Sequence, residues 1–350
     1  MKKKPLIVKW SAVGIILLFV GTCIIPGIAQ DTEKPLPTSR GNWLYVGGSE
    51  SGNYTRIQDA LDNVSDGGTV FVYKGTYYEN IQIDKTVKLI GEIKQETIID
   101  GSGLATVIEI PYGWHCNWED IEITNFTIRN CGTGSEQAGI SVESDRNTIS
   151  NNIFYGNSIG VFVGYYCHNN LVINNYFYNN TEGIRVDKNS QGGSGLTYLG
   201  GNTVEYNKQG IILYWTADTY MKYNRIRFNT IGLEIRASEL INVSYNAFEE
   251  NDIGVKLYIA EDNRIDHNNF LHNEKDVDFF ESRGPLQVKK AVAAWGHNYW
   301  GESSIYPKII RGIREINMYF LPYVGISFKI PWFNIDWNPA QEPYDITGMT

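Results

Sequence analysis

Residues that could bind or cleave a sugar recur at fixed distances after a repeated glycine. The glycines are Gly139, Gly160, Gly183, Gly210, Gly232 and Gly254. Arg185 and Glu234 stand two residues after such a glycine, and a second column stands four residues after it: Glu143, Asp187, Tyr214, Arg236 and Tyr258. Aromatic faces stack on pyranose rings, and Arg and Asp bind hydroxyl or carboxylate groups. The alternative is an ordinary solvated face with weak ion pairs.

The same columns contain the candidates for catalysis, which are Glu143, Asp187 and Arg236. Glycoside hydrolysis needs two carboxyl groups about 5–9.5 Å apart. Glu143 and Asp187 are two repeats apart, which corresponds to roughly 10 Å if the repeats stack like strands. A calcium-dependent lyase would need clustered carboxylates, and Glu234 has no such neighbours. The Asp-Asp and Gly-His-Gly motifs of polygalacturonases are absent. The sequence therefore favours a non-catalytic protein.

Metal ligands are sparse. Copper sites use clusters of His, Cys or Met, and the best pair is His267 with His272 in one repeat. His115, His168 and His297 are scattered, as are Met221, Met318 and Met349. We predict no bound cofactor, with copper and calcium as the alternatives. Beyond Cys23 the cysteines are Cys116, Cys131 and Cys167, an odd number without a Cys-x-x-Cys pair. They are predicted to be core residues with at most one disulfide.

The glycines belong to a repeat of about 22 residues, at intervals of 21, 23, 27, 22 and 22. Apolar residues occupy the positions one and three after each glycine, so each glycine begins a strand with one buried face. Positions two and four then point outward. Such a repeat accommodates three short strands and three turns, which is one coil of a β-helix. Asparagines eight and three residues before each glycine are predicted to form hydrogen-bonded ladders and left-handed turns.

The predicted solenoid needs a cap at each end. Residues 55–64 are predicted to form a short helix with Thr55 as N-cap, Gln58 as its capping-box partner and an apolar stripe. Residues 306–350 leave the repeat and are rich in Pro and Trp. They are predicted to form an irregular C-terminal cap, and the alternative is an exposed aromatic patch that meets a partner.

The N-terminus is predicted to direct export. Three lysines precede an apolar stretch and small residues near Ala29, which indicates a signal peptide over residues 1–29. The alternative is an uncleaved anchor, which would be the protein's only membrane contact. The formal net charge of −9 and the lack of a basic stripe argue against nucleic-acid binding. An extracellular, periplasmic or cell-surface location is expected.

Four stretches of the sequence carry a resemblance to known proteins. The segment "TRIQDALDNVSDGGTVFVYKGTYYENIQIDKTVKLIG" resembles the N-terminal cap and first coil of pectin-lyase-like β-helix proteins. The segments "NTISNNIFYGNSIGVFV", "NRIDHNNFLHNEKDVDF" and "GHNYWGE" resemble the NosD-like family. The resemblance covers roughly residues 42–305. It implies the fold more than the activity, because this fold hosts lyases, hydrolases, epimerases and non-enzymes.

These observations predict an all-β, right-handed parallel β-helix over residues 42–305, with about nine or ten coils. The predicted function is non-catalytic binding of a polysaccharide or of a cell-surface protein. The alternatives are a polysaccharide lyase or glycoside hydrolase acting on the same face, and a NosD-like periplasmic copper-handling accessory protein. The predicted contacts are Arg185, Asp187, Tyr214, Glu234, Arg236 and Tyr258.

Overall fold

The computed structural model describes residues 42–112, 119–164, 167–187, 196–283, 293–321 and 324–346. The predicted signal peptide lies outside these ranges, as do His115, Cys116 and Met349. Among the helices of the described ranges, none has the length and apolar character needed to cross a membrane.

The chain winds through three sheets in turn, and each new coil pairs in parallel with the one before it. Sheet A contains β1 (Trp43–Val46), β2 (Gly68–Val72), β5 (Val87–Gly91), β8 (Glu122–Thr124), β11 (Thr148–Ser150), β14 (Asn170–Ile173), β17 (Thr197–Gly200), β20 (Thr219–Lys222), β23 (Asn242–Ser244), β26 (Asn263–Asp266) and β29 (Ala293–Gly296). Sheet B contains β3 (Gly75–Tyr78), β6 (Thr97–Asp100), β9 (Thr127–Arg129), β12 (Ile153–Tyr155), β15 (Tyr176–Tyr178), β18 (Thr203–Glu205), β21 (Arg225–Arg227), β24 (Ala247–Glu249) and β27 (Asn269–Leu271).

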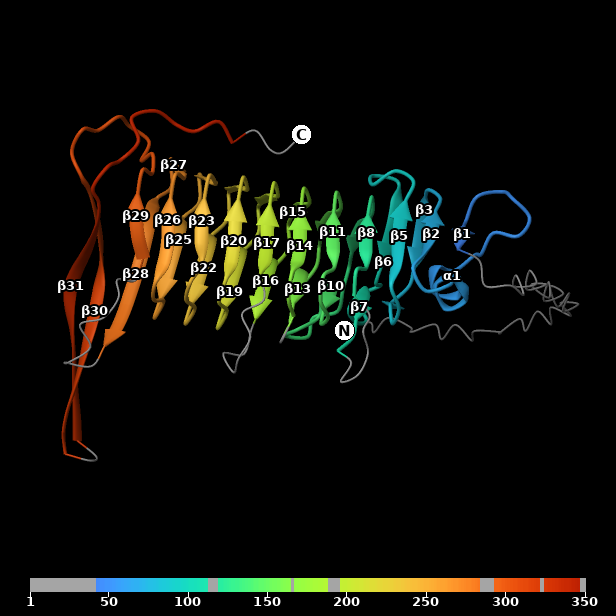
Figure 1. Ribbon diagram of the computed structural model, residues 1–350, viewed down its shortest axis with the longest axis horizontal. Helices are drawn as coiled ribbons and strands as arrows, with labels where there is room; N and C mark the ends of the chain where they lie inside the picture. Colours follow the sequence, from blue (N-terminus) through green and yellow to red (C-terminus); the bar gives the residue numbers. More distant parts are fainter. Residues whose placement is uncertain are drawn as a thin grey trace, which may run out of the picture. The chain divides into compact units, whose positions relative to one another are not determined.

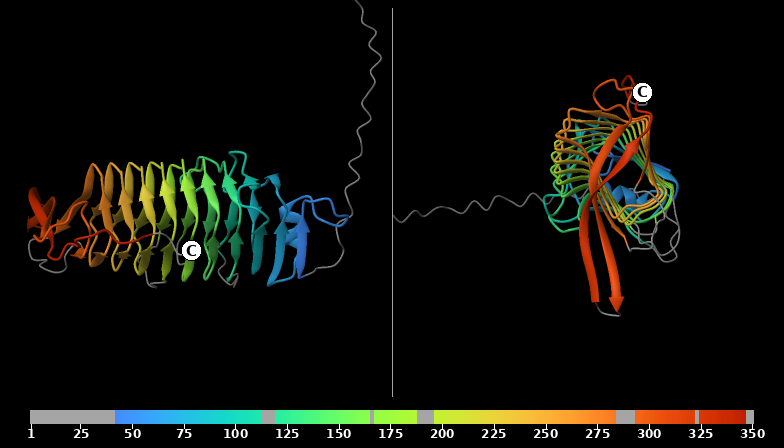
Figure 2. Two further views of the ribbon diagram at one scale, coloured as in Figure 1. Left: turned by 90° about the horizontal axis from the view of Figure 1, so that it is seen from above. Right: turned by 90° about the vertical axis from the view of Figure 1, so that its left-hand side faces the viewer.

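The third sheet holds the strands that the repeated glycines begin. Sheet C contains β4 (Ile81–Gln82), β7 (Ile108–Ile110), β10 (Ala138–Val142), β13 (Ile159–Val163), β16 (Glu182–Asp187), β19 (Gln209–Tyr214), β22 (Ile231–Arg236), β25 (Ile253–Tyr258), β28 (Lys275–Arg283), β30 (Lys308–Leu321) and β31 (Val324–Asp336). Figure 1 shows the coils following one another from blue to orange, and Figure 2 shows the same succession from two further directions. The predicted right-handed parallel β-helix is confirmed.

The core fills the space between the three sheets. The residues three after each glycine, including Val142, Val163, Val186 and Leu213, are fully buried, as the repeat predicted. Aromatic rings stack from coil to coil, with Phe154 and Phe177 4.7 Å apart between ring centroids. Cys131 is a free thiol in this core, and Cys167 is buried in it as well.

Asparagine ladders run along two of the three turns, from the coil of Asn152 and Asn157 onward. The first ladder comprises Asn152, Asn175, Asn202, Asn224, Asn246, Asn268 and Asn298. In each step the backbone N–H of one asparagine donates to the Oδ1 of the next, over 2.9–3.0 Å. The ladders were predicted, but their asparagines are not the left-handed residues. The residue before each ladder asparagine has positive φ instead, as at Tyr223 and His267.

The N-terminal helix α1 (Ile57–Asn63) is capped from another coil. The prediction of Thr55 as N-cap is wrong, because Arg56 is the cap residue and its side chain makes no capping hydrogen bond. The carboxylate of Glu79 instead accepts the N–H groups of Ile57 (2.8 Å) and Gln58 (3.1 Å). A carboxylate at a helix N-terminus satisfies free N–H groups and complements the helix dipole.

The C-terminal segment is more regular than predicted. Strands β30 and β31 form a long antiparallel hairpin that extends sheet C past β28. Pro331 lies within β31, although the proline-rich residues 306–350 were predicted to be irregular. Sheet order makes β31 the edge strand, where a proline without an N–H is tolerated. The side chain of Asp336 at the end of β31 is fully buried.

Candidate functional site

Sheet C brings the six predicted contact residues onto one face. Parallel pairing aligns Asp187 with Tyr214, Tyr214 with Arg236, and Arg236 with Tyr258. Arg185 and Glu234 occupy the neighbouring column of outward positions, two coils apart. The repeat alone fixes this arrangement, because side chains two residues apart on a strand share a face.

Arg236 is the central residue of this face. Its guanidinium carbon lies 5.9 Å from the ring centroid of Tyr214 and 5.8 Å from that of Tyr258, one coil to each side. Its Nη2 donates to Glu234 Oε1 over 2.6 Å. Contact with two rings and a carboxylate holds the guanidinium in one position. About half of the Arg236 side chain remains exposed.

A tryptophan that sequence reasoning missed extends this surface. Trp215 follows Tyr214 at the turn after β19, and its ring packs edge-on against Tyr214 at 6.1 Å. The exposed fractions are 48% for Trp215 and 39% for Tyr258. We call Tyr214, Trp215, Arg236 and Tyr258 the sheet C patch. Trp215 stands five residues after Gly210, one position beyond the second column of the sequence analysis. Extending that column by one residue would have identified it.

Two predicted contacts are less accessible than their outward positions suggested. Glu234 is 1% exposed, because Arg236, Lys256 (3.7 Å) and Gln209 (2.7 Å) surround its carboxylate. Asp187 is 2% exposed, and its Oδ2 accepts two hydrogen bonds from Arg185, at 3.0 and 2.6 Å. The prediction that they face solvent is therefore wrong. The arginines that form ion pairs with Asp187 and Glu234 cover both carboxylates.

The segment before β10 contacts this face at Arg185. The Arg185 guanidinium donates to the carbonyl of Ser135 over 3.4 Å. Burial raises the pKa of the Asp187 carboxyl, and the hydrogen bond from Arg185 opposes this without cancelling it. Asp187 is thus held by Arg185 and shielded from solvent.

Glu143, the third carboxyl of this face, has a raised pKa. Burial is the main cause, and repulsion from Glu109 and Glu136 adds to it. A raised pKa favours the protonated form, which is the form of a general acid. Because Glu143 is separated from Asp187 by the coil of β13 (Ile159–Val163), the two carboxyls lie two strand spacings apart, roughly 10 Å.

The raised pKa predicts how stability depends on pH. Below the ordinary glutamate pKa of 4.5, Glu143 is protonated in both the folded and the unfolded chain. As pH rises from there to the higher folded pKa, the unfolded chain ionises first, so the folded chain loses stability, and this loss levels off above the folded pKa. We expect Glu143→Gln to be more stable than the wild type by an increasing margin above pH 4.5, measured by urea unfolding. Exposed Glu239→Gln is the control, and a margin that shrinks with pH would contradict the prediction.

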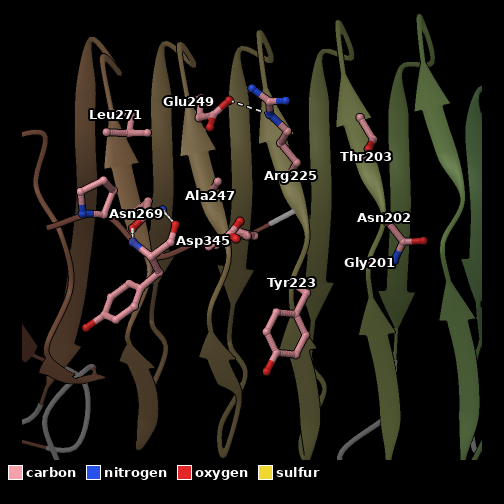
Figure 3. A pocket seen from close by; sticks show the side chains of 13 residues that line it. Gly201, Asn202, Thr203, Tyr223, Arg225, Ala247, Glu249, Asn269, Leu271 and Asp345 are labelled. Carbon is pink, nitrogen blue, oxygen red and sulfur yellow. Dashed lines mark hydrogen bonds and ion pairs between the residues drawn. The ribbon is translucent and has the colours of Figure 1, made fainter. Parts of the chain in front are cut away.

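A groove lies between the C-terminal tail and sheet B. Its volume is about 450 Å³, and its lining residues come from β18, β21, β24, β27 and residues 343–346. Figure 3 shows Tyr223 on one side and the Arg225–Glu249 ion pair on the other, with Asp345 from the tail between them. Sequence reasoning missed this groove, because nothing in the repeat indicates where the tail returns.

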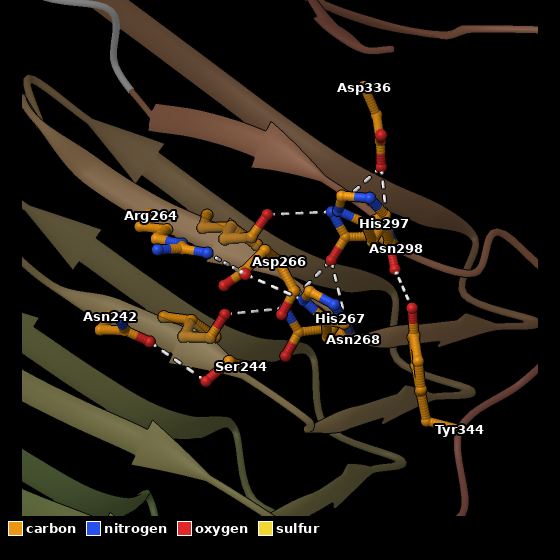
Figure 4. Close-up of polar contacts among 12 residues, drawn as sticks. Asn242, Ser244, Arg264, Asp266, His267, Asn268, His297, Asn298, Asp336 and Tyr344 are labelled. Atoms are coloured by element: carbon orange, nitrogen blue, oxygen red, sulfur yellow. Dashed lines mark hydrogen bonds and ion pairs between the residues drawn. The ribbon is translucent and has the colours of Figure 1, made fainter. Parts of the chain in front are cut away.

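The pairing of the histidines differs from the predicted one. His267 lies at the turn between sheets A and B, while His272 lies at the turn after β27, so the predicted pair is separated by that strand. His267 instead stacks on His297 of the next coil, at 4.9 Å between ring centroids. Figure 4 shows this stack beside Asn268 and Asn298. Among the described residues, no three His, Cys, Asp or Glu side chains gather as ligands of a metal ion.

Solved structures resemble this chain at low sequence identity. The complex of XylC with xylose has a TM-score of 0.59 and 10% identity, covering 77% of this chain and 71% of that one. The DFA-IIIase of Arthrobacter chlorophenolicus A6 with DFA-III has a TM-score of 0.48 and 11% identity, covering 79% and 85%. The A-module of the mannuronan C-5 epimerase AlgE6 of Azotobacter vinelandii has a TM-score of 0.43 and 15% identity, covering 69% and 88%.

The sequence comparisons point to a family. No curated protein sequence matches the chain. The sequence model of the family described as "Periplasmic copper-binding protein (NosD)" matches residues 61–306, well over half of the chain. That range takes in the coils from α1 to β29. The chain therefore belongs to the NosD family.

Proposed function

We propose that this protein is exported and binds a glycan chain on the outer face of sheet C without cleaving it. The observation that carries the proposal is Arg236, held between Tyr214 and Tyr258 and fixed by buried Glu234. Its remaining N–H groups can donate to sugar hydroxyl or carboxylate oxygens. The half-exposed rings of Trp215 and Tyr258 offer apolar surface to a pyranose ring.

The ion pairs of this face support binding over catalysis. A nucleophile or general base must reach the substrate. Asp187 and Glu234 are instead buried and bound to arginines, so neither presents a free carboxylate at the surface. The structural neighbour XylC was solved in complex with xylose, which supports a sugar as the ligand class of this face.

A catalytic function is the second candidate, and the raised pKa values of Glu143 and Asp187 favour it. The enzyme would be a polysaccharide lyase or hydrolase with a protonated carboxyl as acid. Assays for new reducing ends and for unsaturated products, on acidic and neutral polysaccharides, separate the two functions. Turnover that is lost in Asp187→Asn would replace our proposal with the enzyme.

The sheet C patch gives a direct binding test. A glycan array identifies the ligand, and titration calorimetry then measures its affinity. We expect Trp215→Ala combined with Tyr258→Ala to weaken binding at least tenfold, about 1.4 kcal/mol, because the stacking surface is removed. Tyr220→Ala is the matched control, because Tyr220 is a comparably exposed ring on sheet A. Equal affinity in the double variant and the wild type would show that sheet C is the wrong face.

Copper binding is the property named in the family description. The described residues do not fit a preformed copper site, because His267 and His297 stack face to face and the Met221 side chain is fully buried in the core. The role of a copper-handling accessory protein would therefore need copper ligands other than His267, His297 and Met221. Equilibrium dialysis against Cu(I) and Cu(II) tests it, and near-stoichiometric copper on the purified protein would favour that role over glycan binding.

Export accounts for the N-terminal segment. The family description places its members in the periplasm, which agrees with the lysines and apolar residues that begin this sequence. N-terminal sequencing of the mature protein distinguishes a signal peptide cleaved near Ala29 from a retained anchor. A cytoplasmic pool that still begins at Met1 would oppose export.

A further inference from the structure

We propose that the groove under the C-terminal tail is a second saccharide site, which holds a ring of a neutral glycan against Tyr223. We call it the tail groove. It lies on sheet B and at the turn between sheets A and B, away from the sheet C patch. Saccharide binding in the tail groove does not depend on the function proposed for sheet C.

The roof of the tail groove is fixed in place. Asn269 donates to the carbonyl of Tyr344 over 2.8 Å and accepts its N–H over 2.9 Å. The Tyr344 hydroxyl donates to the carbonyl of His297 over 2.7 Å, and its ring packs edge-on against Tyr245 at 5.6 Å. These four contacts of Tyr344 hold residues 343–346 over β24 and β27, so the site is formed before any ligand arrives.

One wall is the end of a stack of rings. At successive turns, Tyr223, Tyr245, His267 and His297 stack with centroid separations of 5.7, 5.0 and 4.9 Å. The next position in this column is Gly201, which has no side chain and also lines the groove. The stack therefore stops at Tyr223, whose second face points toward the coil of Gly201.

Position 201 has no side chain of its own for two reasons, and the side-chain amide of Asn174 lies beside it. Its φ of +63° is one that residues with a Cβ rarely adopt, and a Cβ there would collide with the amide of Asn174. A sugar ring on Tyr223 would continue the stack by one step. Pyranose rings bind aromatic faces through their C–H groups, so this wall favours a saccharide.

The opposite wall supplies hydrogen bonds to hydroxyl groups. Arg225 and Glu249 form an exposed ion pair at 2.9 Å, and the small side chains of Thr203 and Ala247 leave room between the walls. With Asp345 the formal charge of the groove is −1, from one arginine and two carboxylates. A uronate would meet repulsion here, so the ligand is a neutral sugar. The volume of about 450 Å³ lies within the usual range of about 300–1,000 Å³ for small-molecule sites.

Calorimetry with defined oligosaccharides tests the site. The probes are cellohexaose, mannohexaose and xylohexaose as neutral chains, and hexagalacturonate as the acidic one. The full chain carries Trp215→Ala and Tyr258→Ala throughout, so that the sheet C patch does not contribute. We expect at least one neutral hexaose to bind in this background at least tenfold more tightly than hexagalacturonate.

Variants in that background locate the binding. Tyr223→Phe keeps the ring and should stay within twofold, while Tyr223→Leu should weaken binding at least tenfold. Arg225→Ala with Glu249→Ala removes only an exposed ion pair, so it should fold normally and also lose affinity. Tyr206→Leu is the matched control, because Tyr206 is likewise a left-handed turn residue stacked on a ring, that of Phe228. The proposal is overturned if no neutral hexaose binds, if hexagalacturonate binds as tightly, or if Tyr223→Leu keeps the affinity.

Discussion

Replacing Asn224 by leucine is expected to destabilise the fold more than a surface change in the solenoid. The Asn224 Oδ1 accepts the N–H and the side-chain amide of Asn202, both at 3.0 Å, and its Nδ2 donates to the Leu199 carbonyl at 2.8 Å. Leucine has a similar size but leaves these groups buried and unpaired. At about 1–3 kcal/mol for each unpaired group, the loss is roughly 3–5 kcal/mol of unfolding free energy.

Urea unfolding followed by circular dichroism measures this loss. Asn242→Ala serves as the control, because Asn242 lies on the outer side of sheet A and accepts a hydrogen bond only from its neighbour Ser244 in the described structure. It should cost less than 1 kcal/mol, as expected for a surface change. A similar small effect for Asn224→Leu would show that the ladder does not carry the stability assigned to it.

Replacing Asp336 by leucine is expected to detach the C-terminal hairpin from the last coil. Its Oδ2 accepts the backbone N–H of Asn298 (3.0 Å), the Asn298 side-chain amide (3.2 Å) and the Trp300 Nε1–H (3.2 Å). Asp336 thus takes the place that the next ladder asparagine would occupy. Losing these charge-assisted bonds should cost roughly 3–5 kcal/mol and should raise hydrogen exchange in β29 and β30 first.

The variant Asp336→Asn tests whether the shape or the charge of the Asp336 side chain stabilises the hairpin. An asparagine carbonyl can accept the same three donors, so this variant should recover at least half of the lost stability. Exposed Glu342→Leu is the control in the tail and should leave exchange in β29 and β30 unchanged. If Asp336→Leu exchanges like the wild type, the hairpin is held by its apolar contacts and not by the ladder.

The repeat was sufficient to predict the coil and the alignment of the candidate contact residues on sheet C. Interactions between like positions of successive coils determine both, and these positions recur every 22 residues or so in the sequence. Val142 and Leu213 are buried for this reason, and Tyr214, Arg236 and Tyr258 align for the same reason. Their roles in binding stay predictions.

The features that the sequence did not reveal depend on contacts outside the repeat. Arg185, which pairs with buried Asp187, also reaches back 50 positions to the Ser135 carbonyl. The helix cap comes from Glu79, 22 residues beyond Ile57, and not from the local Thr55 motif. The hairpin forms despite Pro331 because the proline falls on an edge strand. No local pattern contains this information.

The asparagine ladders also have a direction. Every rung runs the same way: the backbone N–H of a coil donates to the side chain of the coil that follows it in sequence. A nascent chain that emerges from its N-terminus can therefore fold coil by coil, with only its newest turn waiting for an acceptor. Asp336 supplies the last acceptor after synthesis has passed the final coil. The growing solenoid is thus open at its advancing end until the hairpin arrives and closes it.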